Sequence, residues 1–168
     1  LTVKTSNLCS EITLPTGIDK DGRDRTAVCC LSSLNLEKYD EWKDDPDMIG
    51  DVMRFLDNVL SDFINKAPEQ FKDAKYSAER ERSVGLGVMG FHSFLQKKRI
   101  PLESVMAKSW NKKIFKNIHE KVNQASKDLA EERGACPDAA EYGFKERFSN
   151  KTAIAPVSYT HLRAHETL

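Results

Sequence analysis

The spacing of apolar side chains changes along the chain, and at first it predicts extended backbone. Residues 8–15 and 26–36 carry short apolar runs without helical spacing, so both stretches are expected to be extended. The connection between them is rich in Gly and Asp, a composition typical of turns. Another short apolar run, at 151–156, is a candidate strand.

Helical periodicity dominates the middle of the chain. From Asp45 to about Lys66 apolar residues recur at steps of three and four, which predicts a helix with Asp45 as its N-cap. A shorter helix is expected to end before Pro101. A long amphipathic helix follows, with Gly134 just past its end. The apolar stripe of this long helix consists of Met106, Trp110, Ile114, Ile118, Val122, Ala125 and Leu129. Extended stretches separated by helices indicate an α/β architecture, built as layers or as a barrel.

The charge balance removes several classes of function. The 168 residues include 26 Lys+Arg and 26 Asp+Glu, so the formal net charge is zero. Proteins that neutralise nucleic-acid phosphates normally carry a basic excess, so neither nucleic acid nor a membrane surface is an expected partner. No run approaches the ~20 apolar residues of a membrane span, and no signal peptide opens the chain, so a cytoplasmic location is expected. In that compartment the four cysteines are more often buried, catalytic or redox-active than disulfide-bonded.

The segment 6–12 is the strongest candidate for chemistry. Alternate side chains of an extended backbone face the same way, so Asn7, Cys9 and Glu11 would project together. A carboxylate beside a thiol disfavours the thiolate, which argues against an ordinary nucleophilic cysteine. The thiol is better suited to act as S–H or as a sulfur radical, with Glu11 as acid or base. On spacing alone, a half-buried strand with unrelated polar residues explains the segment more simply.

Four blocks of sequence favour a chemical role for segment 6–12 over a strand with unrelated polar residues. They are SNLCSEITLPT, AVCCLSSLNL, RSVGLGVMGFHSFLQ and LAEERGACPDAA, in this order. Together they resemble the catalytic (large) subunit of ribonucleotide reductase over about residues 5–156. The resemblance implies that 1–156 is part of the ten-stranded α/β barrel of that subunit. It also implies radical-based reduction of ribonucleotides, with diphosphates favoured, to deoxyribonucleotides for DNA synthesis.

The resemblance assigns roles to the segment around Cys9. Cys9 matches the cysteine whose thiyl radical abstracts the ribose 3′ hydrogen, and Glu11 matches the carboxylate that takes the 3′-hydroxyl proton. Asn7 matches the amide that hydrogen-bonds the substrate. Asn7, Leu8, Cys9, Ser10 and Glu11 together match the substrate-contacting segment on the loop through the barrel centre.

The second block contains two adjacent cysteines. Cys29 matches one member of the redox-active pair that supplies two electrons as the 2′-hydroxyl leaves as water, and its partner is expected outside this chain. On a strand Cys30 would face away from Cys29, so Cys29 is taken as the redox residue and Cys30 as a packing residue. A redox role for Cys30, or a strained vicinal disulfide, stays open as an alternative.

The family also implies partners outside this chain. No cofactor is expected to bind these residues directly, because the radical would come from a separate metal-containing small (beta) subunit. Thioredoxin or glutaredoxin would supply reducing equivalents, nucleotide effectors would bind elsewhere, and the full large subunit would form a homodimer. This is the class I arrangement. The alternatives are the adenosylcobalamin-dependent class II enzyme, which shares the N-x-C-x-E motif, and a non-catalytic thiol-redox or interaction module.

Two further motifs favour structural roles. Gly85, Gly87 and Gly90 spell the dinucleotide-binding pattern G-x-G-x-x-G, but that pattern needs a buried strand immediately before it, and 78–83 indicates a charged helix end. The glycines are therefore expected to allow close packing where a barrel element turns into a helix. The spacing of Cys and His suits no zinc site, so no metal is predicted, and Cys136 is expected to be buried.

The last residues do not fit the family pattern. After Pro156 a loop of small hydroxyl residues that binds the substrate phosphates is expected, whereas 157–168 contains several bulky and charged residues. The expectation is that 157–168 is an unrelated tail, derived from read-through or an adapter, and that this chain alone is inactive.

Overall fold

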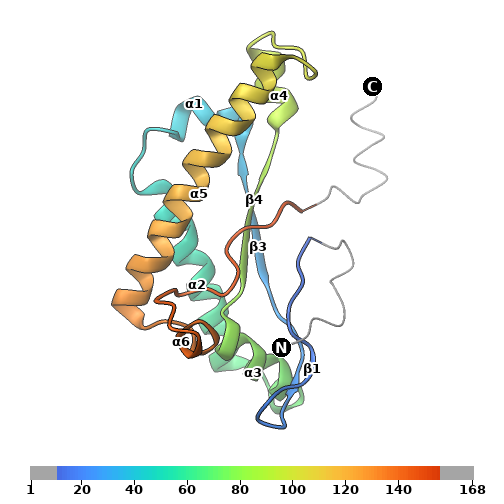
Figure 1. Ribbon diagram of the computed structural model, residues 1–168, viewed down its shortest axis with the longest axis vertical. Coiled ribbons are helices and arrows are strands. Elements are labelled where there is room, and N and C mark those ends of the chain that lie inside the picture. The colour runs from blue at the N-terminus through green and yellow to red at the C-terminus, as the bar shows by residue number, and fades with distance from the viewer. Residues whose placement is uncertain (1–10, 156–168) are drawn as a thin grey trace.

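The computed structural model describes residues 11–155, and these residues form a mixed α/β structure (Figure 1). Short elements come first: β1 (Gly17–Ile18), β2 (Asp24–Arg25), β3 (Cys30–Asn35), η1 (Leu36–Lys38) and α1 (Tyr39–Trp42). The central elements are α2 (Met48–Lys66), η2 (Glu69–Phe71), α3 (Lys72–Glu81) and β4 (Val84–Met89). They are followed by α4 (Phe91–Lys97), α5 (Val105–Arg133) and α6 (Pro137–Glu141). The predicted α/β class is confirmed.

Parallel strands form the centre of the structure. β3 pairs with β4 in parallel, from Cys30 opposite Val84 to Asn35 opposite Met89. Thr152 forms a further parallel bridge to Leu86 on the other edge of β4. Parallel neighbours need long crossover connections, and helices supply them here: α2 and α3 between β3 and β4, α4 and α5 between β4 and Thr152.

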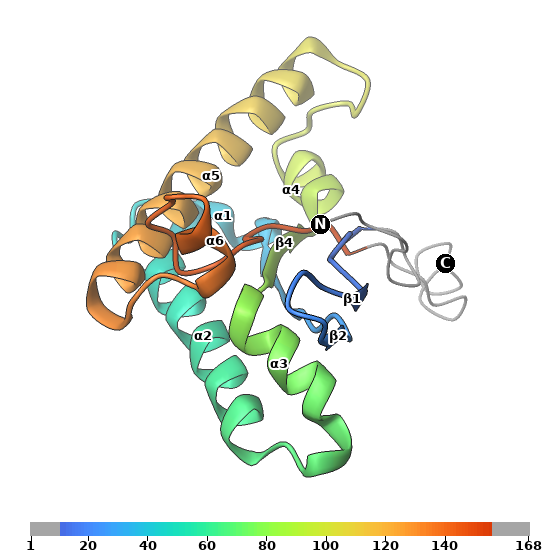
Figure 2. The same cartoon turned by 60° about the horizontal axis from the view of Figure 1, so that its bottom comes forward.

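One face of the strand pair is covered by helices. Figure 1 and Figure 2 show α2 and α5 on one side of β3 and β4, with residues 11–18 on the other. Side chains that alternate along β4, Val84 and Leu86, point into the helix-side core. That core also contains Met53 and Leu60 of α2 and Ile114 of α5, all fully buried. We call the helix-covered face of the β3–β4 pair the outer face.

The opposite face, which we call the inner face, carries glycines that let another segment of the chain pack closely against β4. Gly85 and Gly87 alternate with the core residues of β4 and therefore face this side. A Cβ atom on Gly85 would lie 2.9 Å from the Cβ atom of Ala153, and a Cβ atom on Gly87 would overlap the Ala153 carbonyl oxygen. Ile12, Leu14 and Ala153 form a small separate apolar cluster here. The glycines thus permit the close packing expected of them.

The helix predictions are confirmed, with differences at their ends. α2 begins at Met48 rather than directly after Asp45, because Asp45 Oδ1 accepts the backbone N–H groups of Asp47 and Met48 in the turn before the helix. α5 has Ser104 as its N-cap, accepting from the Ala107 amide. Met106 is not part of the buried stripe, because it lies on the exposed side of the first turn.

Several local features differ from the predicted pattern. Gly85 and Gly87 lie inside β4, a strand that the sequence pattern did not predict, and the segment before them is the end of α3, as expected. Within the described range the run that begins at Lys151 makes only the single bridge at Thr152. The sequence pattern also missed α6, a single short turn of helix. Cys136 is fully buried, as expected. Among residues 11–155 no helix is long and apolar enough to cross a membrane.

Candidate functional site

Glu11 is the first described residue of the predicted catalytic segment. Asn7, Leu8, Cys9 and Ser10 lie outside the described residues. Glu11 is half-buried, and its Oε2 atom is buried without a hydrogen-bond partner among residues 11–155. A buried carboxylate oxygen that lacks a partner is costly in a folded protein. Among residues 11–155, Glu11 therefore has one acceptor atom that no other group uses, as an acid or base requires.

The two adjacent cysteines face opposite sides of the sheet. Cys29 packs against the inner cluster of Ile12, Leu14 and Ala153, whereas Cys30 packs against the helix-side core. The alternation of an extended backbone produces this separation. It agrees with the interpretation of Cys30 as a packing residue, while the redox role of Cys29 stays a prediction.

The surroundings of Cys29 keep its sulfur protonated. Burial raises the pKa of the Cys29 thiol to about 11, and the charges of Cys30, Glu81 and Glu11 act in the same direction. The thiol donates a weak hydrogen bond to the Cys30 carbonyl oxygen at 3.9 Å and accepts one from Ser83 Oγ at 3.3 Å. At neutral pH Cys29 is thus a thiol held in a defined position.

The structure brings Glu11 and Cys29 into one neighbourhood. Glu11 directly precedes Ile12, whose side chain belongs to the cluster against which Cys29 packs. The charge of Glu11 is close enough to act on the Cys29 thiol. Two of the predicted site residues, 18 positions apart in the sequence, therefore lie together on the inner face.

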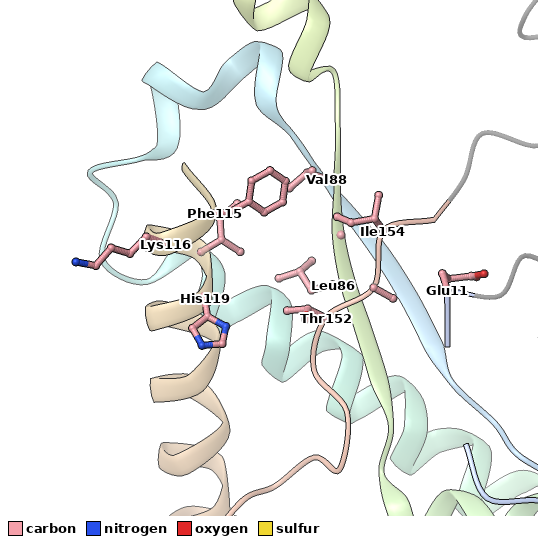
Figure 3. A pocket seen from close by; sticks show the side chains of 11 residues that line it. Glu11, Leu86, Val88, Phe115, Lys116, His119, Thr152 and Ile154 are labelled. Atoms are coloured by element: carbon pink, nitrogen blue, oxygen red, sulfur yellow. The ribbon is translucent and has the colours of Figure 1, made fainter. Parts of the chain in front are cut away.

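A cavity of about 570 Å³ lies beside this region. Figure 3 shows Phe115 and His119 reaching it from α5, and Glu11 on the far side of β4 and the Thr152–Ile154 segment. Its walls are mostly apolar, and Cys29 does not line it. Of the two predicted site residues within 11–155, Glu11 lines the cavity and Cys29 does not.

A buried ion-pair cluster lies at the end of α3 near Cys29. Arg25 contacts Asp19 at 3.3 Å, Glu81 at 3.0 Å and Asp138 at 2.5 Å, so one guanidinium serves three carboxyl groups. Burial raises the pKa of Glu81 to about 7, an effect that Arg25 opposes without cancelling it. Glu81 Oε2 has no hydrogen-bond partner within the described range. Glu81 is consequently a buried carboxyl group that gains or loses its proton near neutral pH.

Sequence reasoning missed two polar residues beside Cys29. Ser83 and Glu81 stand in a charged stretch that was interpreted only as a helix end, 54 and 52 positions after Cys29. Their proximity depends on the parallel register of β3 and β4, which the sequence does not specify. The only feature of the sequence that could have drawn attention to Ser83 is its position directly before the glycine-rich residues 84–90.

Comparison with known proteins agrees with this architecture. The family model described as "Ribonucleotide reductase, barrel domain" matches residues 1–165. The ribonucleoside-diphosphate reductase large subunit of Invertebrate iridescent virus 3 is 47% identical over 156 residues, covering 93% of this chain and 24% of the viral protein. The vitamin B12-dependent ribonucleoside-diphosphate reductase of Thermoplasma acidophilum is 39% identical over 140 residues, covering 76% of this chain and 18% of that protein.

A solved structure is similar as well. The class Id ribonucleotide reductase alpha subunit of Actinobacillus ureae superposes with a TM-score of 0.82 at 41% identity, covering 92% of this chain and 29% of that one. The chain belongs to the family of the ribonucleotide reductase barrel domain. It spans about a quarter of the length of the viral relative. The boundary expected at Pro156 stays a prediction, although the family match continues to residue 165.

Proposed function

We propose that this chain is part of a ribonucleotide reductase large subunit and carries its radical cysteine. The net reaction converts a ribonucleotide, preferably the diphosphate, and a dithiol into a deoxyribonucleotide, a disulfide and water. The observation that carries the proposal is the shared inner-face position of Glu11 and Cys29, in a chain of this family. Glu11 stands two residues after Cys9, so a substrate at this face would meet the acid–base residue and the radical residue together.

Three residues of this chain would open the reaction. A thiyl radical on Cys9 takes the 3′ hydrogen of the ribose, which leaves a carbon radical and a Cys9 thiol. Glu11 accepts the 3′-hydroxyl proton, for which Oε2, without a partner among residues 11–155, is suited. The Asn7 amide holds the substrate so that these atoms stay aligned.

Cys29 would supply one half of the reductant. Replacement of C–OH by C–H is a two-electron reduction, so a dithiol that becomes a disulfide balances it. The raised pKa of Cys29 means that the resting residue carries the proton that accompanies the electron as the 2′-hydroxyl leaves as water. The second cysteine of this pair is expected elsewhere in the longer protein.

The partners follow from the class I assignment. We propose that a separate metal-containing small subunit generates the radical, that thioredoxin or glutaredoxin reduces the Cys29 disulfide, and that the large subunit is a cytoplasmic homodimer. The greater identity to a protein named as a large subunit favours class I over the vitamin B12-dependent class. Turnover by the complete protein with adenosylcobalamin and no small subunit would instead establish class II.

Replacing Cys9 tests the proposal. In the complete large subunit Cys9→Ala should abolish deoxyribonucleotide formation while substrate binding, followed by equilibrium dialysis, persists. Cys30→Ala is the matched control, and it should retain turnover because Cys30 packs on the outer face. Unchanged turnover in Cys9→Ala would favour a thiol-redox or interaction module instead. Deoxyribonucleotide formation by this chain alone would contradict its expected inactivity.

A further inference from the structure

The parallel register places Ser83 beside Cys29. Cys30 pairs with Val84, and the Cys30 N–H donates to the Ser83 carbonyl oxygen at 3.4 Å. One residue earlier on each strand, Cys29 and Ser83 are therefore neighbours, and both side chains lie on the inner face. This geometry is independent of any assumption about the chemistry of Cys29.

Ser83 is buried and follows an anchored residue. It is fully buried, and it follows Arg82, which has a left-handed backbone with φ of 42°. The Arg82 guanidinium is anchored on α2 by Asp57 Oδ1, which accepts from its Nε at 2.8 Å, and by the Asp57 carbonyl oxygen. The residue before Ser83 is thus anchored to α2, and from its buried position the Ser83 hydroxyl donates to the Cys29 sulfur at 3.3 Å.

The other titratable groups that act on Cys29 all oppose its ionisation. Glu11 comes from the segment before the inner cluster, Glu81 from the end of α3, and Cys30 from β3 itself. Each would carry negative charge when ionised, so each disfavours a thiolate beside it. The hydrogen bond from Ser83 acts in the opposite sense, because a donor stabilises the charged sulfur.

We propose that Ser83 is a positioning residue for Cys29, whose hydroxyl orients the sulfur and stabilises its thiolate during disulfide exchange. The proposal rests on the redox role of Cys29 given above. When an external dithiol reduces the Cys29 disulfide, its thiolate bonds to the partner sulfur and the old S–S bond breaks. Cys29 then leaves with the bonding electron pair as a thiolate, accepts the Ser83 hydrogen bond and later takes a proton from water. A better-stabilised leaving thiolate departs faster.

The pH dependence of alkylation tests this role. In the complete large subunit carrying Cys30→Ala, iodoacetamide modification of Cys29 is followed from about pH 7 to about pH 11 by mass spectrometry of the peptide 26–38. Ser83→Ala should move the profile to higher pH by about one pH unit, which is about tenfold slower modification at a fixed pH below the pKa. Ser83→Thr retains the hydroxyl and should restore the parent profile.

Ser77 provides a matched control. It is as fully buried as Ser83, but its hydroxyl has no hydrogen-bond partner among residues 11–155. Ser77→Ala should leave the alkylation profile unchanged. Reduction of the oxidised Cys29 pair by dithiothreitol should slow about two- to threefold in Ser83→Ala and not in Ser77→Ala.

The outcomes separate the two proposals. A Ser83→Ala profile that coincides with the parent, or an equal shift in Ser77→Ala, overturns the role of Ser83 whatever Cys29 does. Dithiol-dependent turnover that survives Cys29→Ser overturns the redox role of Cys29, even where the Ser83→Ala shift is present. A shift confined to Ser83→Ala, together with loss of turnover in Cys29→Ser, supports both.

Discussion

The two faces of the β3–β4 pair differ in what they bury. The outer face is covered by α2 and α5 and contains large aliphatic side chains, among them Leu60 and Ile114, that are fully buried. The inner face has glycines, a three-residue apolar cluster and Cys29, and Leu31 and Met89 next to them are exposed. Apolar burial is the main source of stability, so the outer face holds the fold together. Among residues 11–155 the inner face contributes less apolar burial, and its small side chains let Ala153 pack directly against β4.

The largest expected effect is on the outer face. Ile114→Ala removes a fully buried side chain from α5 and should lower the free energy of unfolding by about 3 kcal/mol, through lost burial and the cavity that remains. Urea unfolding of this chain, followed by circular dichroism, measures it. Val105→Ala on the same helix is the control, since Val105 is 81% exposed and should cost no more than about 0.5 kcal/mol. Equal losses of stability in Ile114→Ala and Val105→Ala would contradict the tight packing of Ile114 on the outer face.

On the inner face, adding a Cβ atom to a glycine is expected to lower the stability of the chain. Gly87→Ala places a Cβ atom against the Ala153 carbonyl oxygen and should destabilise the chain by about 2 kcal/mol, because the backbone must move. Gly50→Ala in α2 meets nothing within 4 Å and should stabilise the chain by about 0.5 kcal/mol. The two Gly→Ala substitutions should therefore change the free energy of unfolding in opposite directions, which urea unfolding curves measure. If Gly87→Ala were neutral, Ala153 would not be packed against β4.

Two buried carboxyl groups, Asp57 of α2 and Glu81 of α3, should respond to pH in opposite directions. Burial alone would raise the pKa of Asp57, but Arg147 and Arg82 outweigh it and lower that pKa below its ordinary value. Burial raises the pKa of Glu81 from 4.5 to about 7. The Asp57 carboxylate contacts therefore contribute to the free energy of unfolding above about pH 4, and this contribution is lost in acid as Asp57 is protonated. Protonated Glu81 makes its full contribution below about pH 4.5, and this contribution is lost as the pH rises through about 7.

Glu81→Gln should flatten the decline in stability between about pH 4.5 and about pH 7, by up to about 3 kcal/mol. The free energy of unfolding in urea, measured at several pH values, shows the change. Glu79→Gln is the control, because Glu79 lies on the exposed side of the same helix. An unchanged slope in Glu81→Gln would mean that Glu81 is ionised throughout, paired with Arg25.

The smallest expected change in stability comes from the adjacent cysteines. Cys30→Ala removes a half-buried sulfur from the outer face and should cost no more than about 1 kcal/mol, and Cys29→Ser should cost about as little. Their effects on activity differ, because only Cys29→Ser should stop dithiol-dependent turnover in the complete subunit. Loss of turnover in Cys30→Ala with Cys29→Ser still active would reverse the assignment of the two residues.

Local patterns in the sequence predicted the long helices α2 and α5, the α/β class and the separation of the two cysteines, but not α6. Helical spacing is a local property, so α2 and α5 could be predicted to within a few residues. The alternation of an extended backbone is equally local, and it placed Cys29 and Cys30 on opposite faces. The N-x-C-x-E segment and three further blocks indicated the family, which the barrel-domain match shows.

Contacts between residues far apart in the sequence depend on the tertiary structure. The register of β3 against β4 is set by packing over the whole sheet, so the contact of Ser83 with Cys29 could not be derived from residues 54 positions apart. The same holds for Glu81, whose raised pKa results from burial beside an Arg25 that Asp19 and Asp138 already share. Local patterns fix which way a side chain faces. Its proton affinity depends on solvent exclusion and on charges brought together by the fold.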